Sequence, residues 1–85
     1  MTIYITITSS LREAAKMNAV FNDGEIENVF EAIVTQPFPL YTNVWVLETE
    51  TEFDSDFNEI SFLIEQLRSS LHNSGLNEFT IDWES

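Results

Sequence analysis

The chain has 85 residues, of which 15 are Asp or Glu and only three are Lys or Arg, so its formal net charge at pH 7 is −12. A chain of this length supports one hydrophobic core, and we expect a single domain over residues 1–85. The charge excludes direct binding to nucleic acid or to an anionic membrane, because the phosphates of both would repel the protein. The expected partner is therefore a basic protein; the alternative is that the charge only keeps the protein soluble or reflects a high-salt habitat.

The composition indicates a folded protein of a reducing compartment. Seven Phe, two Trp, two Tyr and a hydrophobic content of 44% supply a core despite the high charge. Cysteine is absent, which excludes disulfides and thiolate metal sites. The alternating segment at the N-terminus is too short for a signal peptide or a membrane span. We therefore expect a cytoplasmic protein.

The first 24 residues predict a strand and then a helix. Apolar and polar residues alternate over residues 3–8, which is the period of a strand with one apolar face. Ser10 and Glu13 have the spacing of a capping box, so a helix is expected to run from there toward Phe21. The sequence Asn-Asp-Gly at residues 22–24 then breaks this helix.

Residues 25–35 allow two interpretations. Their apolar residues recur at helical spacing and favour an amphipathic helix, with the apolar positions at Ile26, Val29, Phe30 and Ile33. The alternative is a strand that follows the Asp-Gly turn signal. That strand would point Asn28 inward beside apolar neighbours, so the helix is favoured.

The second half of the chain predicts strand, helix and strand. Pro37 and Pro39 indicate an extended loop. Residues 44–53 are rich in β-forming residues and alternate in polarity, which indicates a strand. Residues 57–75 carry a wide apolar stripe and are expected to form a helix that ends at the glycine in position 75. A last strand is expected over residues 79–83.

This order of elements is typical of an α+β fold. We expect one sheet of three or four strands, covered on one face by two or three helices, in the order β-α-α-β-α-β. If residues 25–35 form a strand, the order becomes β-α-β-β-α-β, the ferredoxin-like arrangement. The helix over 57–75 is expected to cross between parallel neighbouring strands. The other face of the sheet is then open to water or to another subunit.

Acidic side chains recur at every second residue from the end of the strand over 44–53 into the next turn. They are Glu48, Glu50, Glu52, Asp54 and Asp56. A strand advances about 3.3 Å per residue, so these carboxylates would stand about 6.6 Å apart along one line. This carboxylate ladder has about half the charge density of one DNA strand and suits a row of Lys and Arg that grips a nucleic-acid backbone. The alternative is that the acids protect an edge strand from aggregation.

Two further groups of residues are candidates for partner binding. Three acids, Glu25, Glu27 and Glu31, are expected to assist the ladder. Three aromatic residues, Tyr4, Phe38 and Tyr41, lie on the second sheet face or in the Pro-rich loop and are candidate anchors or dimer contacts. Five other aromatics are expected mostly in the core, namely Trp45, Phe53, Phe62, Phe79 and Trp83.

The sequence offers little for catalysis or metal binding. It has one histidine, His72, and no Gly-rich phosphate loop, so we expect no enzyme activity, no catalytic residues and no cofactor. Residues 54–65 have calcium-ligand types at several positions of an EF-hand loop, but Glu59 stands where that loop needs Gly. We therefore expect no metal site.

In length, net charge and the carboxylate ladder, the chain resembles the small acidic inhibitors that phages and mobile elements direct against host defence nucleases. These are the DNA-mimic anti-restriction proteins and the anti-CRISPR proteins. The resemblance implies a protein that blocks a nucleic-acid-binding groove stoichiometrically. Two alternatives remain open: an immunity or antitoxin protein that neutralises a basic toxin, and a structural protein that associates with itself.

Overall fold

The computed structural model describes residues 1–51 and 57–85, with the side chain of Phe57 left out. Its elements in chain order are β1 (Thr2–Ser9), α1 (Ala14–Asn22), α2 (Glu25–Phe30), β2 (Ile33–Thr35), β3 (Val44–Glu50), α3 (Phe57–Asn73) and β4 (Phe79–Glu84). The expected α+β fold is confirmed. The described residues form a four-stranded antiparallel sheet and three helices.

The strands lie in the order β2-β3-β1-β4, and every neighbouring pair is antiparallel. It follows that β3 and β4 are parallel to each other but are separated by β1. The prediction that residues 57–75 cross between parallel neighbours is therefore wrong, because α3 joins strands that flank a third one. The element order is the ferredoxin-like β-α-β-β-α-β arrangement, with its first helical segment divided into α1 and α2.

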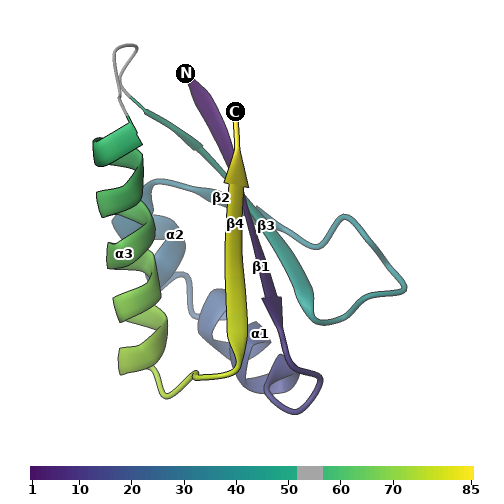
Figure 1. Ribbon diagram of the computed structural model, residues 1–85. Helices are drawn as coiled ribbons and strands as arrows, with labels where there is room; N and C mark the ends of the chain where they lie inside the picture. Colours follow the sequence, from purple (N-terminus) through teal and green to yellow (C-terminus); the bar gives the residue numbers. More distant parts are fainter. Residues whose placement is uncertain (52–56) are drawn as a thin grey trace.

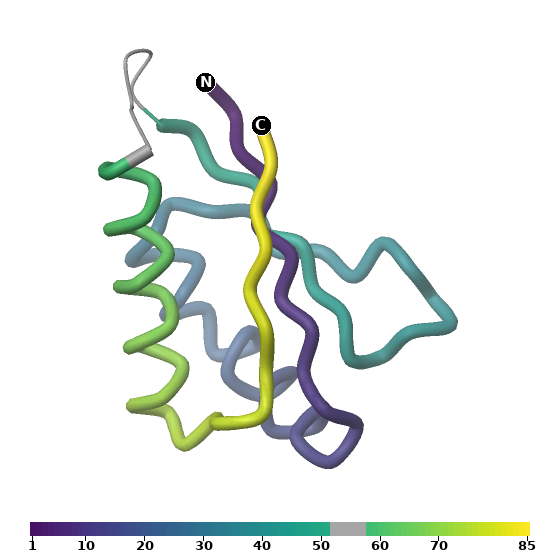
Figure 2. The backbone as a smooth tube through the Cα atoms, in the orientation of Figure 1, coloured from purple at the N-terminus to yellow at the C-terminus, as the bar shows by residue number. Residues whose placement is uncertain are grey.

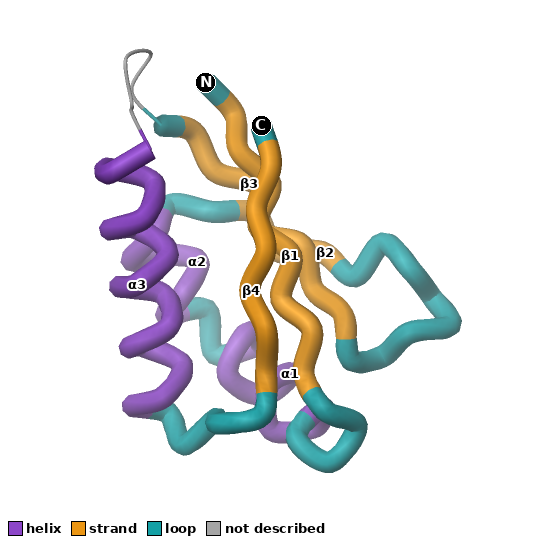
Figure 3. The backbone as a smooth tube through the Cα atoms, viewed as in Figure 1, coloured by secondary structure: helices purple, strands orange, loops and turns teal. Residues whose placement is uncertain are grey.

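The protein has two layers, with all three helices on one face of the sheet (Figures 1 and 3). The two chain ends lie close together because β1 begins beside the end of β4, where Tyr4 is paired with Glu84. β1 occupies the middle of the sheet. Its Ile3, Ile5 and Ile7 are at most 2% exposed, which is the burial expected of the most apolar strand face.

Residues 25–35 form both predicted elements in succession, a short helix and then a short strand. The helix ends because Glu31 adopts a left-handed conformation with φ of 49°, and the N–H of Ala32 donates to the Glu27 carbonyl at 3.0 Å. This is a Schellman-type ending, which usually has Gly or Asn at the left-handed position. The hydroxyl of Thr49 donates to the Phe30 carbonyl at 3.1 Å, so β3 also fixes this end of the helix. Ile33 therefore leaves the expected helical stripe and lies exposed on β2.

The later elements follow the predicted ranges and differ from them only near their ends. Strand β3 ends at Glu50, and the last residues of the predicted strand, 52 and 53, lie outside the described part of the chain. Helix α3 ends at Asn73, and Gly75 has the expected left-handed φ of 88°. The N–H of Leu76 closes this end on the Leu71 carbonyl at 3.1 Å.

The core lies between the sheet and the helices. Buried apolar residues come from every helix, from the two central strands and from two connecting segments; they are Ile3, Ile5, Ile7, Met17, Phe21, Ile26, Ala32, Trp45, Leu47, Ile60, Ile64, Leu67, Leu71 and Leu76. Phe79 and Trp83 pack against this cluster at its margin. Phe62, expected in the core, is 66% exposed, because it falls on the side of α3 that faces away from the sheet. The prediction for Phe53 lies outside the described residues.

The capping box at the start of the first helix is only half formed. The Ser10 hydroxyl accepts a bond from the Glu13 N–H at 3.2 Å, and the helix begins one residue later, at Ala14. The Glu13 carboxylate does not accept a bond from the Ser10 N–H, because that N–H donates to the Glu78 carbonyl. The carboxylate instead accepts bonds from the N–H groups of Glu78 at 2.7 Å and Asn77 at 2.9 Å. These bonds hold the pKa of Glu13 below its ordinary value and tie α1 to the start of β4.

Candidate functional site

One face of the sheet has no helix over it, and we call it the open face. The strand registers and the alternation of burial assign its residues, which are Thr2, Tyr4, Thr6 and Thr8 of β1, Ile33 and Thr35 of β2, Val44, Val46, Glu48 and Glu50 of β3, and Thr80, Asp82 and Glu84 of β4. Each is exposed or half-buried. The open face is thus a polar, threonine-rich surface that carries four carboxylates.

The four carboxylates form two columns, one on each side of β1. Glu48 and Glu50 lie on β3, as the predicted ladder requires, while Asp82 and Glu84 lie on β4. The registers place Tyr4 opposite Glu48 on one side and opposite Glu84 on the other. Two strand spacings separate the columns, which are therefore about 10 Å apart. Tyr4 is 40% exposed between them.

No cationic side chain lies on the four strands that the structure describes. The three basic side chains are elsewhere, where Arg12 pairs with Glu78 at 3.6 Å and Arg68 with Glu65 at 3.3 Å. Lys16 donates to the Gly75 carbonyl at 2.8 Å. The N-terminal amine stands 3.7 Å from Glu50 at one end of the face. The open face is therefore strongly anionic, which favours a cationic partner.

Glu50 has a further contact, because the Thr2 hydroxyl donates to its carboxylate. Among the described residues, Glu48, Asp82 and Glu84 have no ion-pair partner. These three carboxylates are exposed to solvent and available to an external cation. The negative charge at the centre of the open face is consequently not neutralised within the protein.

The structure does not bring all the predicted acids together. Glu52, Asp54 and Asp56 lie outside the described residues. Glu25, Glu27 and Glu31 belong to α2 or its end, in the helical layer, because Ile26 anchors α2 on the inner face of the sheet. These three acids line three different hollows of the surface. The structure therefore places these three acids away from the open face that carries Glu48 and Glu50, and their part in partner binding stays a prediction.

A groove runs between α2, the end of β3 and α3, with a volume of about 740 Å³. Two apolar residues at this groove, Val29 and Phe62, are 65% and 66% exposed. Carboxylates also line it, namely Glu31, Glu50, Glu59 and Glu65. The groove lies on the helical side of the molecule, and only Glu50 belongs both to it and to the open face.

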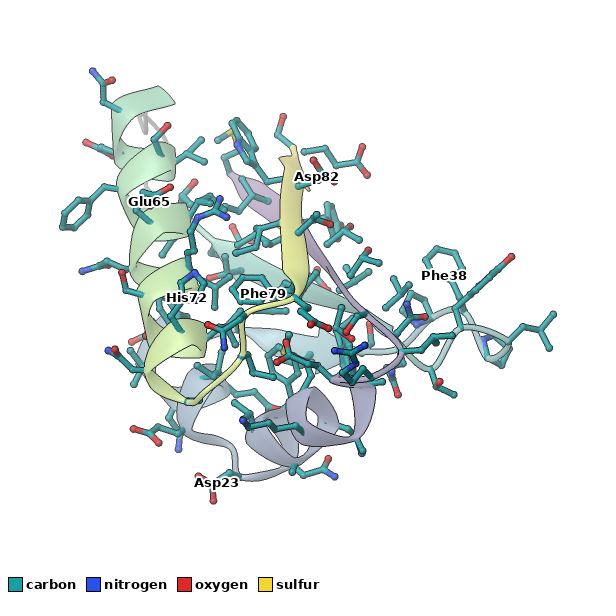
Figure 4. The ribbon with its side chains drawn as sticks, turned by 60° about the horizontal axis from the view of Figure 1, so that its bottom comes forward. Asp23, Phe38, Glu65, His72, Phe79 and Asp82 are labelled. Atoms are coloured by element: carbon teal, nitrogen blue, oxygen red, sulfur yellow. The ribbon has the colours of Figure 1, made fainter. Side chains whose placement is uncertain are left out.

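The aromatic candidates in the Pro-rich loop stand apart from the body of the protein. The loop between β2 and β3 projects away from the helices (Figure 2), and Phe38 lies far out on it (Figure 4). Phe38 and Tyr41 are exposed and pack edge to face with ring centroids 6.5 Å apart. Leu40 beside them is 90% exposed. The side-chain amide of Gln36 donates to the Thr42 carbonyl at 2.9 Å and holds the loop's base together.

His72 has structural contacts at the end of α3. Its Nδ1 lies 2.9 Å from the Leu76 carbonyl oxygen, and its ring packs on Phe79 with centroids 5.1 Å apart. Within residues 1–51 and 57–85, no group of three or more His, Asp or Glu side chains is placed to hold a metal ion. No helix in the same residues is both long enough and apolar enough to cross a membrane.

Sequence reasoning missed Asp82 and Glu84 as members of the acidic surface. Asp82 alternates with Ile81 and Trp83 in the last predicted strand, and Glu84 follows that strand at the same spacing, so the signal for an acidic strand face was present. Their relation to Glu48 depends on the strand order, which a single strand pattern does not contain. Comparison of the chain with models of known families, with curated proteins and with solved structures finds no match.

Proposed function

We propose that this protein is an acidic inhibitor whose open face binds the basic nucleic-acid-binding surface of a nuclease or another DNA-binding complex. It acts by occupying that surface in the manner of a DNA mimic, as anti-restriction and anti-CRISPR proteins do, and without catalysis or a cofactor. The observation that carries the proposal is the set of four carboxylates on one sheet face that has no cationic side chain among its described residues. A cytoplasmic location accompanies it, since the chain has no Cys.

The spacing of the carboxylates supports this proposal. The two columns are about 10 Å apart, and neighbours within a column are about 6.6 Å apart. The major groove of B-DNA is about 12 Å wide, and phosphates line both of its sides. Lys and Arg side chains arranged to contact phosphates across a groove therefore match two anionic columns better than a single row.

The position of Glu48 argues against a purely protective role. Charged residues commonly protect edge strands from aggregation. Glu48, however, lies on an interior part of the sheet, where Ile33 of β2 and Tyr4 of β1 flank it. Edge protection therefore does not account for Glu48, although it does apply to Asp82 and Glu84 on β4. The repulsion within the column destabilises the fold, and partner binding gives a reason to retain it.

The test is affinity capture of DNA-binding proteins from a bacterial lysate by three tagged forms of the protein. They are the natural chain, Glu48→Lys with Glu84→Lys, and Glu25→Lys with Glu27→Lys, which makes the same charge change on α2. A nuclease captured by the natural chain should be retained by the α2 variant and lost by the open-face variant. Duplex DNA should displace the captured nuclease from the natural chain. Equal loss with both variants would show that net charge alone is responsible, and would contradict the proposal.

A second function, neutralisation of a basic toxin by an immunity or antitoxin protein, is favoured by one separate observation. The exposed cluster of Phe38, Leu40 and Tyr41 has the character of an anchor for a shape-specific interface. Such an interface keeps most of its affinity as salt rises, whereas binding through the two columns weakens steeply. Affinity that persists in high salt and is lost with Tyr41→Ala would support this function over the first.

A further inference from the structure

The outer edge of β4 presents backbone groups that β1 does not use. The N–H of Ser10 donates to the Glu78 carbonyl at 2.7 Å and continues the register in which Thr8 pairs with Thr80 and Thr6 with Asp82. In an antiparallel pair, bonded and non-bonded residue pairs alternate. The even-numbered residues of β4 therefore bond to β1, and the N–H and C=O of Phe79 and Ile81 point outward.

Nothing in the described chain covers this edge. Figure 1 looks onto β4, and no other segment passes in front of it. The strand is six residues long and contains no Pro, Gly or Lys, so its protection against pairing is limited to the carboxylates of Asp82 and Glu84, which repel an acidic strand and attract a basic one. The opposite edge of the sheet, β2, has only three residues. β4 is thus the edge on which a further strand would find the most partners.

The side chains of β4 define what kind of strand fits. Phe79 and Ile81 are half-buried and face the helical layer, and Phe79 lies against His72 in Figure 4. Asp82 and Glu84 are exposed on the open face. A strand added beside β4 would meet apolar side chains on one of its faces and carboxylates on the other. Alternating apolar and basic residues match both.

The same charges disfavour a second copy of the chain. Two copies of the chain could pair their β4 strands antiparallel through the outward-pointing backbone groups. The three registers that overlap the strands most place Asp82 opposite its own copy, Glu84 opposite Glu78, or Asp82 opposite Glu78. Like charges directly opposite each other destabilise a strand pair. The acidic pattern therefore selects against self-pairing and in favour of a basic strand.

We infer that the β4 edge binds an extended segment of the partner protein as a fifth strand, with Lys or Arg at alternate positions facing Asp82 and Glu84. Backbone hydrogen bonds to Phe79 and Ile81 supply affinity, and the basic side chains supply selectivity. This inference rests on the proposed function only in requiring a basic partner. It names an extended segment at the edge, in addition to the surface that faces the two columns.

Amide hydrogen exchange, measured by NMR on the ¹⁵N-labelled protein, tests the inference directly. The probe is the synthetic peptide Thr-Lys-Val-Lys-Val-Lys-Thr at millimolar concentration, and the control peptide has Glu in place of each Lys. In the free protein, the amides of Thr80 and Asp82 should exchange slowly and that of Ile81 quickly, because only the former bond to β1. The Lys peptide should slow exchange at Ile81 by about tenfold or more, and the Glu peptide should not.

Charge exchange provides the second arm. Asp82→Lys changes an exposed side chain and is expected to fold; it should weaken the effect of the Lys peptide, while Glu25→Lys on α2 should not. Unchanged exchange at Phe79 and Ile81 in millimolar Lys peptide would overturn the inference, as would equal effects of both peptides. Protection of Ile81 that grows with protein concentration alone would overturn it in favour of a second copy. A peptide that shifts the resonances of Tyr4 and Glu48 but leaves Ile81 unprotected would refute edge pairing and leave the proposed function standing.

Discussion

Neutralising Glu48 should stabilise the protein, and the gain should disappear in high salt. Glu48 has no ion-pair partner among the described residues, and two like charges flank it on the open face. Glu50 stands two residues along the same strand, at about 6.6 Å, and Glu84 stands two strands away, at about 10 Å. Glu48→Gln keeps the size of the side chain and removes both repulsions.

The size of the effect follows from these two separations. Coulomb energies in water, screened over about 30 Å at 0.01 M salt, give up to about 0.8 kcal/mol of added free energy of unfolding. With screening over about 8 Å at 0.15 M, the gain falls to about 0.4 kcal/mol, and at 1 M it is about 0.1 kcal/mol. These are upper figures, because the unfolded chain keeps part of the repulsion between Glu48 and Glu50. For a protein of this size, the low-salt gain corresponds to a rise in Tm of about 3–6 °C.

Thermal unfolding followed by circular dichroism at the three salt concentrations measures this effect. The matched control is Glu65→Gln, which makes the same chemical change where the carboxylate is paired with Arg68 at 3.3 Å. At low salt, Glu65→Gln should leave Tm unchanged or lower it slightly, whereas Glu48→Gln should raise Tm. If Glu48→Gln does not raise Tm at 0.01 M salt, or if its gain is the same at 1 M, then the carboxylates of the open face do not repel one another as their placement requires.

Two further predictions concern the fold. Leu67 of α3 is fully buried against the sheet, so Leu67→Ala should lower the free energy of unfolding, measured in urea, by about 2–5 kcal/mol. Leu67→Met should lower it by less than about 1.5 kcal/mol. A loss below about 1 kcal/mol for Leu67→Ala would contradict this packing. Backbone bonds from Glu78 and Asn77 lower the pKa of Glu13 from 4.5, so the folded state favours the ionised carboxylate. Its contribution is present above the ordinary pKa and is lost as the pH falls through the lowered one. Glu13→Gln should therefore reduce Tm at neutral pH, the difference should vanish in strong acid, and a pH-independent difference would refute the assignment.

The stabilising and destabilising residues lie on opposite sides of the sheet. Its inner face carries the buried Ile and Leu residues that hold the helices. Its outer face carries four acids whose mutual repulsion opposes folding. Among the described residues, Glu48 is the one of these four acids that stands on an interior strand without an ion-pair partner, and stability alone gives no reason for a charge there. This division makes charge substitutions on the open face informative, because a variant that gains stability and loses the proposed partner would separate the two effects.

The sequence by itself determined the class of fold and most of its elements. The period-two pattern of β1, β3 and β4 and the apolar stripe of α3 are local signals, because burial on one face repeats every two or every 3.6 residues. The same alternation is enough to place Glu48 and Glu50 on one face of their strand. The left-handed conformation of Gly75 at the end of α3 could also be predicted, since glycine adopts that conformation without steric cost.

Tertiary structure decided the rest, because the information lies in contacts between distant segments. Glu31 ends α2 without Gly or Asn, and the hydroxyl of Thr49 binds the end of that helix from another strand. The antiparallel order β2-β3-β1-β4 places Glu84 and Glu48 on either side of Tyr4. The acids of α2 lie instead in the helical layer, away from this face. Strand order depends on which apolar faces pack best together, and no local pattern encodes it. The sequence thus determined that an acidic strand face exists, and the fold determined that it has two columns with a tyrosine between them.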